Sequence, residues 1–335
     1  MGSVDRFRAL PTIQVPNTAQ DNIRFSTDAE NNKRTERHLL RVTGQVDITG
    51  AGAALRNRGS ILAALGDIGF SDGGVDKVVL DARLARFIAE AMSPSALPAT
   101  RLAGVGIQAA TQLAETVPLW LASPRSLNPD ETKYVEINKQ LQQKVFITPI
   151  RQITRLSSGG GLVGTITNVN ATVESVYDEM IGIAPVLTVY TSQVIQDVSG
   201  ANTQLKVDLR GSRYTRGIAI QQDTDQGEVS DIINNLVLRG DKGSIIGDRG
   251  IPFRDLVEHS QEEYGGAVTA ALGYLFIDFQ RYGRLTTLLS PYQDSNIRLE
   301  LDVQPSVGNT GSKVRVAKWD YERTAVTAEP MPFTI

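Results

Sequence analysis

Along most of the chain, apolar and polar residues alternate with a period of two, which is typical of antiparallel strands that bury one face. From His38 onward, the apolar face contains Leu40, Val42, Val46 and Ile48, and the polar face contains Arg41, Thr43, Gln45 and Asp47. The same alternation recurs in residues 134–138, 144–150, 204–210, 216–222, 298–303 and 312–319, with turn-forming residues between these segments. Many short strands separated by turns predict an all-β sandwich or barrel.

Only a few segments have helical spacing instead. In residues 84–92, Leu84, Phe87 and Ile88 lie at positions i, i+3 and i+4, and residues 253–264 repeat this spacing with an apolar face of their own. This pattern predicts two short amphipathic helices.

Each of these two helices ends a longer pattern that occurs twice. Residues 65–92 contain a short apolar run, a Gly/Asp/Lys turn, a second run and a helix, and residues 234–260 repeat that order, with Ile68 matching Leu236. Further along, Glu136 in residues 128–140 matches Glu300 in residues 291–304, and a last strand follows in each half. We therefore predict two similar all-β domains, 37–155 and 186–335, joined by a connector over residues 156–185. The alternative is that any β-rich chain produces such matches, because all such chains consist of similar turns and alternating strands.

The first 36 residues have a different composition, being polar and without periodic apolar positions. They predict an extended N-terminal arm outside the core. Its cations and scattered apolar residues, above all Arg6, Phe7, Arg8, Arg24 and Phe25, are candidates for contact with a neighbouring subunit or an anionic membrane. We expect such an arm to act in assembly rather than in folding; a disordered tail is the alternative.

Composition narrows the class of protein. At 335 residues the chain is long enough for two domains with a core each, and 41% hydrophobic with 21% charged residues is typical of a folded globular protein. The formal net charge of -3 argues against coating of nucleic acid. The chain has no cysteine, no signal-peptide-like start and no apolar run of transmembrane length, which argues against disulfides, secretion by that route and membrane spanning.

The candidate chemical motifs are weak. The glycine-rich residues 159–164 precede β-branched residues rather than a helix, so we predict no nucleotide cofactor. With only His38 and His259 as histidines, a clustered metal site is not expected. The Arg-Gly-Asp at 239–241 is predicted to form a turn. The acid pairs Asp223/Asp225 and Glu262/Glu263 are predicted to lie on the solvated surface. We predict no catalytic, cofactor or metal residues, and no enzyme.

The tandem β domains, the segment VLTVYTSQVIQDV that leads into the second half, and GYLFIDFQRYGRLTTLL followed by IRLELDV and KVRVAKW as closing strands resemble a known family. The chain resembles the double jelly-roll major capsid proteins of tailless, often membrane-containing, icosahedral viruses of bacteria. The resemblance implies two tandem eight-stranded jelly rolls with a few short helices and an N-terminal arm on the inner side of a shell.

The resemblance also implies the partners and the location. Three chains would form a pseudo-hexameric trimer that tiles an icosahedral shell in the virion, after assembly in the host cytoplasm. The expected partners are the chain itself, neighbouring capsomers, penton or minor capsid proteins and an internal lipid membrane through the arm, with no sequence-specific nucleic acid. A minor capsid or spike protein and a carbohydrate-binding adhesive protein are the alternatives. The host, genome type and lattice number stay open.

Overall fold

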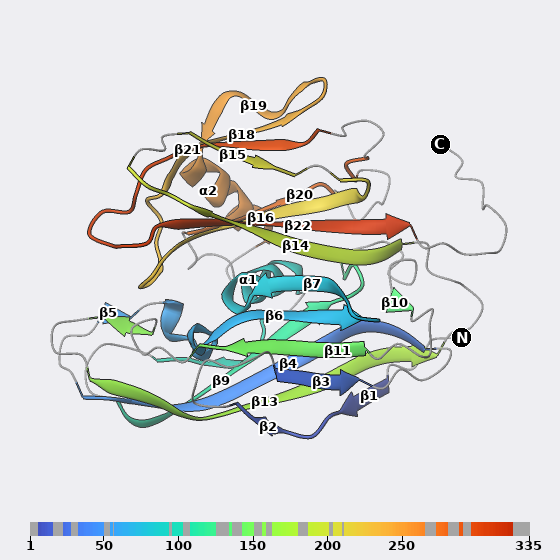
Figure 1. Ribbon diagram of the computed structural model, residues 1–335, viewed down its shortest axis with the longest axis vertical. Coiled ribbons are helices and arrows are strands. Elements are labelled where there is room, and N and C mark those ends of the chain that lie inside the picture. Colours follow the sequence, from blue (N-terminus) through green and yellow to red (C-terminus); the bar gives the residue numbers. More distant parts are fainter. Residues whose placement is uncertain are drawn as a thin grey trace.

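The computed structural model shows two β sandwiches, the first in the lower part of Figure 1 and the second in the upper part. The structure describes residues 6–15, 23–27, 33–49, 54–55, 57–93, 96–102, 108–124, 134–135, 143–150, 156–158, 163–179, 187–200, 204–209, 211–264, 273–280, 288–290 and 296–323. No helix among these residues is long and apolar enough to cross a membrane.

The first sandwich has eight principal strands in two facing sheets. One sheet has the order β1-β13-β4-β9 and the other the order β3-β11-β6-β7. The strands are β1 (Arg6–Ala9), β3 (Ile23–Thr27), β4 (Lys33–Ile48), β6 (Leu65–Asp72), β7 (Val75–Asp81), β9 (Gln108–Trp120), β11 (Gln143–Pro149) and β13 (Gly164–Glu179).

The second sandwich repeats this arrangement. One sheet has the order β14-β22-β16-β20 and the other the order β15-β21-β18-β19. The strands are β14 (Leu187–Asp197), β15 (Gln204–Asp208), β16 (Tyr214–Thr224), β18 (Ile233–Gly240), β19 (Gly243–Pro252), β20 (Tyr274–Asp278), β21 (Arg298–Val303) and β22 (Lys313–Arg323).

The two sandwiches therefore have the same topology, strand for strand in chain order. In each roll, the first, third, sixth and eighth strands form one sheet, and the second, fourth, fifth and seventh strands form the other. This is the arrangement of an eight-stranded jelly roll. The predicted fold, two tandem jelly rolls, is confirmed. Short additional strands are β2 (Ile13–Gln14), β5 (Ala54–Leu55), β8 (Ala99–Thr100), β10 (Tyr134–Val135), β12 (Ser157–Ser158) and β17 (Gly227–Glu228), and 3-10 turns cover Asn57–Gly59 and Ile61–Ala64.

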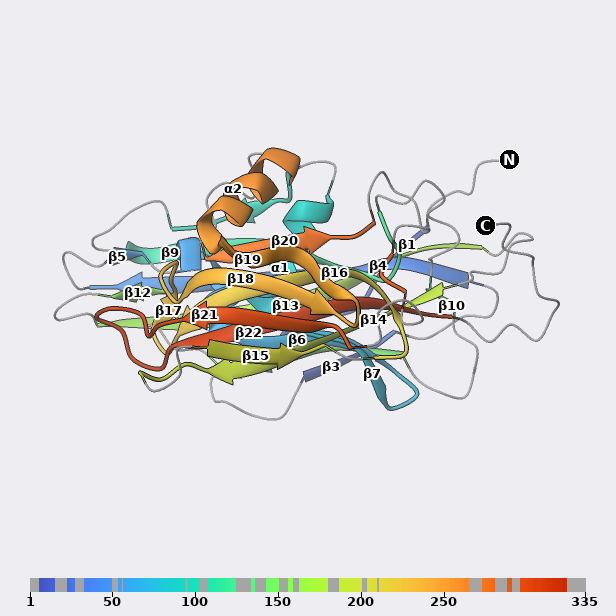
Figure 2. The same cartoon turned by 90° about the horizontal axis from the view of Figure 1, so that it is seen from above.

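The repeated hairpin and helix of the sequence analysis are both present. Strands β6 and β7 lead into α1 (Ala82–Met92), and β18 and β19 lead into α2 (Phe253–Tyr264). The Arg-Gly-Asp of residues 239–241 lies at the turn between β18 and β19, as predicted, with Arg239 paired opposite Ser244. Helix α2 projects from the outline of the molecule in Figure 2, whereas α1 lies beneath the strands of the second roll.

Two predicted segment boundaries are wrong. The predicted arm contains β1 and β3, which pair with β13 and β11 and supply two of the eight strands of the first roll. The predicted connector contains β13, which pairs with β4 along most of its length. Strands β1 and β3 are too short to show a clear alternation, and the alternation of Val169, Ala171 and Val173 in β13 is interrupted by two register shifts.

One predicted correspondence is also wrong. Strand β21, which carries Glu300, occupies the place that β11 has in the first roll, and β22 occupies the place of β13. Residues 134–135 instead form β10 at the side of β4; Glu136 itself lies outside the described residues. The error arose because neighbouring strands of a β protein share one pattern of alternation.

The apolar faces of the strands form two cores. In the first roll, Leu40, Val42 and Val46 of β4 face Ile68 and Phe70 of β6, which confirms the predicted alternation. In the second, the β15, β18 and β21 side chains face those of β16 and β22, with Leu236, Leu299, Ile220 and Val316 fully buried.

His38 is the one histidine within these cores among the described residues. Its ring lies 5.1 Å from that of Phe70, its Nδ1 is 2.9 Å from the Ser175 hydroxyl, and its Nε2 has no hydrogen-bond partner among the described residues. Burial lowers the pKa of His38 to about 3, so the folded protein holds it neutral.

We predict that removing residues 1–30 destabilises the first roll rather than leaving a folded protein. The deletion takes away β1, β3 and the fully packed side chain of Phe25, and it leaves the edges of β13 and β11 without partners. Circular dichroism melting should show a lower midpoint or a lost transition. A truncated protein that melts like the intact chain would contradict the assignment of β1 and β3 to the roll.

We predict that stability falls on acidification because of His38. Unfolded His38 binds a proton near pH 6.5 and folded His38 only near pH 3, so its contribution is complete above pH 6.5 and falls by about 1.4 kcal/mol per pH unit below it. His38→Gln should flatten the slope of unfolding free energy between pH 6.5 and 4.5, measured by urea titration. His259→Gln, on the exposed face of α2, is the control and should leave the slope unchanged; equal slopes in all three proteins would refute this origin.

Candidate functional site

The two rolls meet at α1, which lies between them in Figure 1. Every residue of α1 is buried, including Arg83, Arg86 and Glu90. The helix begins at Asp81, whose carboxylate accepts a hydrogen bond from the Arg83 backbone N–H at 3.0 Å, and it ends with the Ser93 N–H donating to the Ala89 carbonyl. Its apolar side chains pack into the first core; of its charged side chains, Arg83 reaches the second roll, whereas Arg86 and Glu90 pair with residues of the first.

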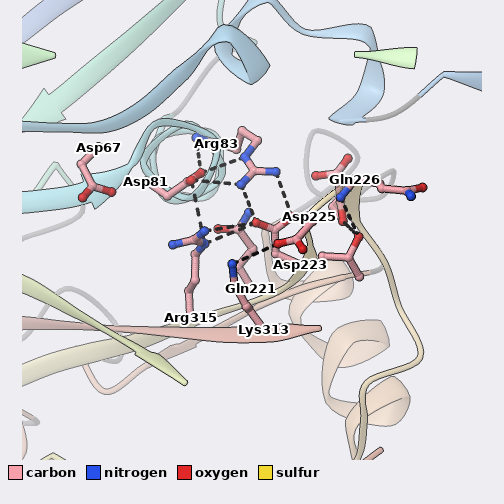
Figure 3. Close-up of polar contacts among 12 residues, drawn as sticks. Asp67, Asp81, Arg83, Gln221, Asp223, Asp225, Gln226, Lys313 and Arg315 are labelled. Carbon is pink, nitrogen blue, oxygen red and sulfur yellow. Dashed lines mark hydrogen bonds and ion pairs between the residues drawn. The ribbon is translucent and has the colours of Figure 1, made fainter. Parts of the chain in front are cut away.

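Arg83 joins the rolls directly (Figure 3). Its Nε donates to Asp81 at 2.9 Å, and its two terminal nitrogens donate to the two carboxylate oxygens of Asp223 on β16 at 3.0 and 2.7 Å. All three side chains are at most 4% exposed. A bidentate pair of this kind fixes both distance and orientation, which a single contact does not.

A second cation from the other roll completes this cluster. Arg315 of β22 donates to Asp223 at 3.3 Å and lies 3.9 Å from Asp81. Next to it, at the exposed margin, Lys313 pairs with Asp225 at 3.1 Å. Two arginines thus balance two carboxylates inside the junction, with no net charge left buried.

A second charged cluster lies further along α1. Arg86 donates to Glu90 at 2.8 Å and lies 3.2 Å from Glu115 of β9, and Arg101 contacts both carboxylates. Arg58, which has the left-handed backbone angle φ 54°, pairs with Glu90 at 3.1 Å. Burial alone would raise the pKa of Glu90, but Arg58, Arg86 and Arg101 together hold it below its usual value.

The third cluster surrounds Arg216 on β16, whose side chain is fully buried. Its guanidinium lies 4.6 Å from the Trp319 ring centroid, donates to the Tyr321 hydroxyl at 3.2 Å and to Ser123, and pairs with Asp278 at 3.4 Å. Because Ser123 belongs to the first roll and the other partners to the second, this cluster also crosses the junction.

The backbone joins the rolls in one sheet. Strands β7 and β14 pair in parallel through Thr191 and Val78, so the β3-β11-β6-β7 sheet continues into β14-β22-β16. Gln193 extends the contact, since its amide oxygen accepts from the Asp81 N–H and its amide nitrogen donates to Asp67. A small, mainly apolar pocket lined by both tryptophans, Trp120 and Trp319, lies beside this contact.

The buried charged groups of the junction are paired with one another and hold the two rolls together. Burial alone would lower the pKa of Arg83, but Asp81 and Asp223 raise it well above its usual value, so Arg83 stays charged and paired. Burial raises the pKa of Glu228, which accepts a 2.7 Å hydrogen bond from Tyr274. Among the described residues no group of three or more His, Asp or Glu side chains could hold a metal ion. Paired, enclosed charges orient the rolls.

The structure separates the residues that the sequence analysis chose as a site. Arg6, Phe7 and Arg8 lie in β1, while Arg24 and Phe25 lie in β3 of the facing sheet. Arg24 is exposed. Phe25 is buried in the first core, so the prediction that Phe25 makes an external contact is wrong. The glycine-rich stretch 159–164 lies mostly outside the described residues, and its last glycine begins strand β13 rather than a helix.

The charged residues of the junction were missed, and Asp223 was wrongly read as solvated. Glu262 and Glu263 are exposed on α2, as predicted. A usable signal was present in residues 81–90: Asp81 at the start of the helix, then Arg83, Arg86 and Glu90 at i, i+3 and i+7 on one face. Such a face is usually solvated, and only the tertiary structure shows that a second domain covers it.

Comparison with known proteins places the fold. No family model and no curated protein matches the sequence. Among solved structures, the chain is similar to the major capsid protein of the Sulfolobus turreted icosahedral virus, with TM-score 0.66 and 13% identity over 95% of this chain and 96% of that one. The PBCV-1 virus capsid gives 0.61 and 9% over 96% and 94%, and the major capsid protein of bacteriophage PM2 gives 0.58 and 9% over 97% and 100%.

The chain has the fold of the double jelly-roll major capsid proteins. The similarity covers nearly the whole chain, and so includes both rolls and the junction between them. In this double jelly roll, the Arg83 and Arg216 clusters join one roll to the other.

We predict that Arg83→Met lowers the free energy of unfolding by about 3–5 kcal/mol, because it leaves Asp81 and Asp223 buried with less positive charge. Urea denaturation at pH 7 measures this. Arg254→Met is the matched control: its pair with Glu258 on α2 is exposed and should cost less than about 0.5 kcal/mol. Equal losses in both variants would show that Arg83 does not hold the rolls together.

Proposed function

We propose that this protein is a viral major capsid protein that builds an icosahedral shell by association with copies of itself. The observation that carries the proposal is the pair of topologically equal jelly rolls, rigidly joined through buried ion pairs, over the full length shared with capsid proteins of three viruses. A two-roll block needs only three copies to present six equivalent faces to a lattice.

The proposal includes no enzymatic activity. The buried charges of the junction are paired with one another, and the similar solved structures are capsid proteins. The proposed role requires self-complementary surfaces and a fixed shape, and the paired charges at the junction support the fixed shape. The proposed location is the virion shell, with assembly in the host cytoplasm.

The proposed partners are the chain itself as a homotrimer, neighbouring capsomers, and penton or minor capsid proteins. A contact with an internal membrane or a neighbouring subunit through Arg6, Phe7, Arg8 and Arg24 stays a prediction, as does the bacterial host. We propose no sequence-specific binding of nucleic acid, in keeping with the formal net charge of -3.

The two alternatives receive less support. A spike or minor capsid protein with unlike halves does not fit two rolls of equal strand order. A carbohydrate-binding protein usually exposes clustered aromatic rings, whereas Trp319 is buried and Trp120 lines the pocket at the junction.

We predict that the purified intact chain forms a homotrimer that persists on dilution, because the obligate interfaces of a shell block usually bury more than about 2,000 Å². Size-exclusion chromatography with light scattering should give three times the chain mass of 36.3 kDa from high to low micromolar concentration. Electron microscopy of concentrated samples should then show closed shells or flat hexagonal arrays. A stable monomer at micromolar concentration would contradict the proposal.

A further inference from the structure

Three stretches of the first roll meet at the end of its sandwich that carries β5, on the left in Figure 1 and opposite the end marked N. Strand β5 pairs with β12, the Leu102 N–H donates to the Gly59 carbonyl at 3.1 Å, and the Ile150 N–H donates to the Ala64 carbonyl at 2.8 Å. By sequence, the stretches 48–66, 93–108 and 149–163 contain several arginines and no Asp or Glu. A carboxylate that neutralises a cation here therefore comes from another part of the chain.

Two arginines from these stretches share one carboxylate of α1. Arg58 donates from Nη1 to one oxygen of Glu90 at 3.1 Å, and Arg101 donates from Nη2 to the other oxygen at 3.0 Å. Because both oxygens belong to one carboxylate, the two guanidinium groups lie close to each other. The side chains of Arg58 and Arg101 are 16% and 23% exposed, whereas that of Glu90 is 6% exposed. The arginines are thus the solvent-accessible members of this group.

The carboxylates of this cluster do not match its cations in number. Arg58, Arg86 and Arg101 pair with Glu90 and Glu115, which sets three positive charges against two negative ones. Both carboxylates are already shared, since Arg86 and Arg101 each contact Glu90 and Glu115. Charges withdrawn from water are normally paired, so the cluster has room for one more negative group.

The second roll brings one further carboxylate near Arg58, that of Glu228. Burial raises the pKa of Glu228 above its usual value, although Arg58 and a 2.7 Å hydrogen bond from Tyr274 act in the opposite direction. A raised pKa means that the uncharged form of Glu228 is favoured relative to an ordinary glutamate. Glu228 therefore balances the charge of Arg58 only in part.

The unused hydrogen-bond donors of the cluster belong to the same two arginines. The terminal nitrogens of Arg86 donate to the carbonyls of Thr116 and Leu97. In Arg101, by contrast, Nη2 makes the ion pairs, and the buried Nε has no hydrogen-bond partner among the described residues. Within the same part of the chain, the side chain of Arg58 donates only from Nη1. Each guanidinium carries five N–H donors, so both retain donors for an acceptor from outside the chain.

We propose that Arg58 and Arg101 together bind one small oxyanion of the phosphate or sulfate type. Such an anion supplies the missing negative charge and several acceptor oxygens at once, and guanidinium groups recognise tetrahedral oxyanions through paired N–H donors. Chloride supplies the charge without oxygens for two planar forks, so the site should prefer phosphate to chloride. The inference goes beyond the capsid role and does not depend on it.

The test is isothermal titration calorimetry of the full chain with sodium phosphate at pH 7, compared with sodium chloride at equal ionic strength so that general screening is the same. Phosphate should bind saturably with one site per chain. Arg58→Met and Arg101→Met should each weaken this binding by about tenfold or more. Arg254→Met is the matched control, because Arg254 is an exposed arginine of α2 that pairs with Glu258, and it should leave the affinity unchanged.

A second measurement needs no variant and so decides the question even if a substitution impairs folding. Phenylglyoxal modifies accessible guanidinium groups, and mass spectrometry of the unmutated chain measures the rate at each arginine. Saturating phosphate should slow modification of Arg58 and Arg101 several-fold relative to chloride, and leave that of Arg254 unchanged. Phosphate that protects neither arginine, or that binds Arg58→Met and Arg101→Met as tightly as the intact chain, would overturn the proposed site.

Discussion

A charge inside a protein has to be paired, and in this molecule that requirement determines how the two rolls meet. Arg83 belongs to a helix of the first roll, yet one of its two carboxylate partners, Asp223, belongs to the second. Separating the rolls by the width of a water layer would leave these charged groups exposed or without partners, at a cost of several kcal/mol. The second roll therefore has one favourable position on the first, although the backbone connects the two sheets at only one paired position, Thr191 and Val78.

The repeated topology explains why one helix is buried and the other exposed. Both helices follow the second strand of a hairpin, but α1 lies at the edge that the second roll covers, and α2 lies at the corresponding edge of the second roll, which is open in a single chain. Arg83, Arg86 and Glu90 of α1 are enclosed, whereas Arg254, Glu258 and His259 of α2 are solvated. The same local structure thus has two environments, and the difference comes from the number of neighbours and not from the roll itself.

The sequence predicted the parts of the fold that local patterns determine. Alternation located β4, β11, β15, β21 and β22, and helical spacing located both helices, because each of these segments buries one face against a core. It did not locate β1 and β3, since short strands between polar residues and prolines leave no periodic signal, and it matched Glu300 to the wrong strand for want of any distinguishing motif. The sequence analysis did not predict the junction, because a charged helical face is expected to be solvated until a second domain is known to lie on it.

The use of ion pairs at this junction has a geometric consequence for the proposed shell. Apolar contacts such as those of Val78, Leu80 and Trp319 favour burial but allow one surface to slide or rotate on the other, whereas the bidentate contact of Arg83 with Asp223 fixes an angle. In a closed ring every roll-to-roll angle contributes to closure, so an error at one junction recurs in each copy and accumulates around the axis. A two-roll chain with a rigid internal angle leaves only the contacts between copies to be adjusted. The buried charges, which add little to net stability compared with an apolar junction, are therefore best understood as the part of the molecule that sets its shape.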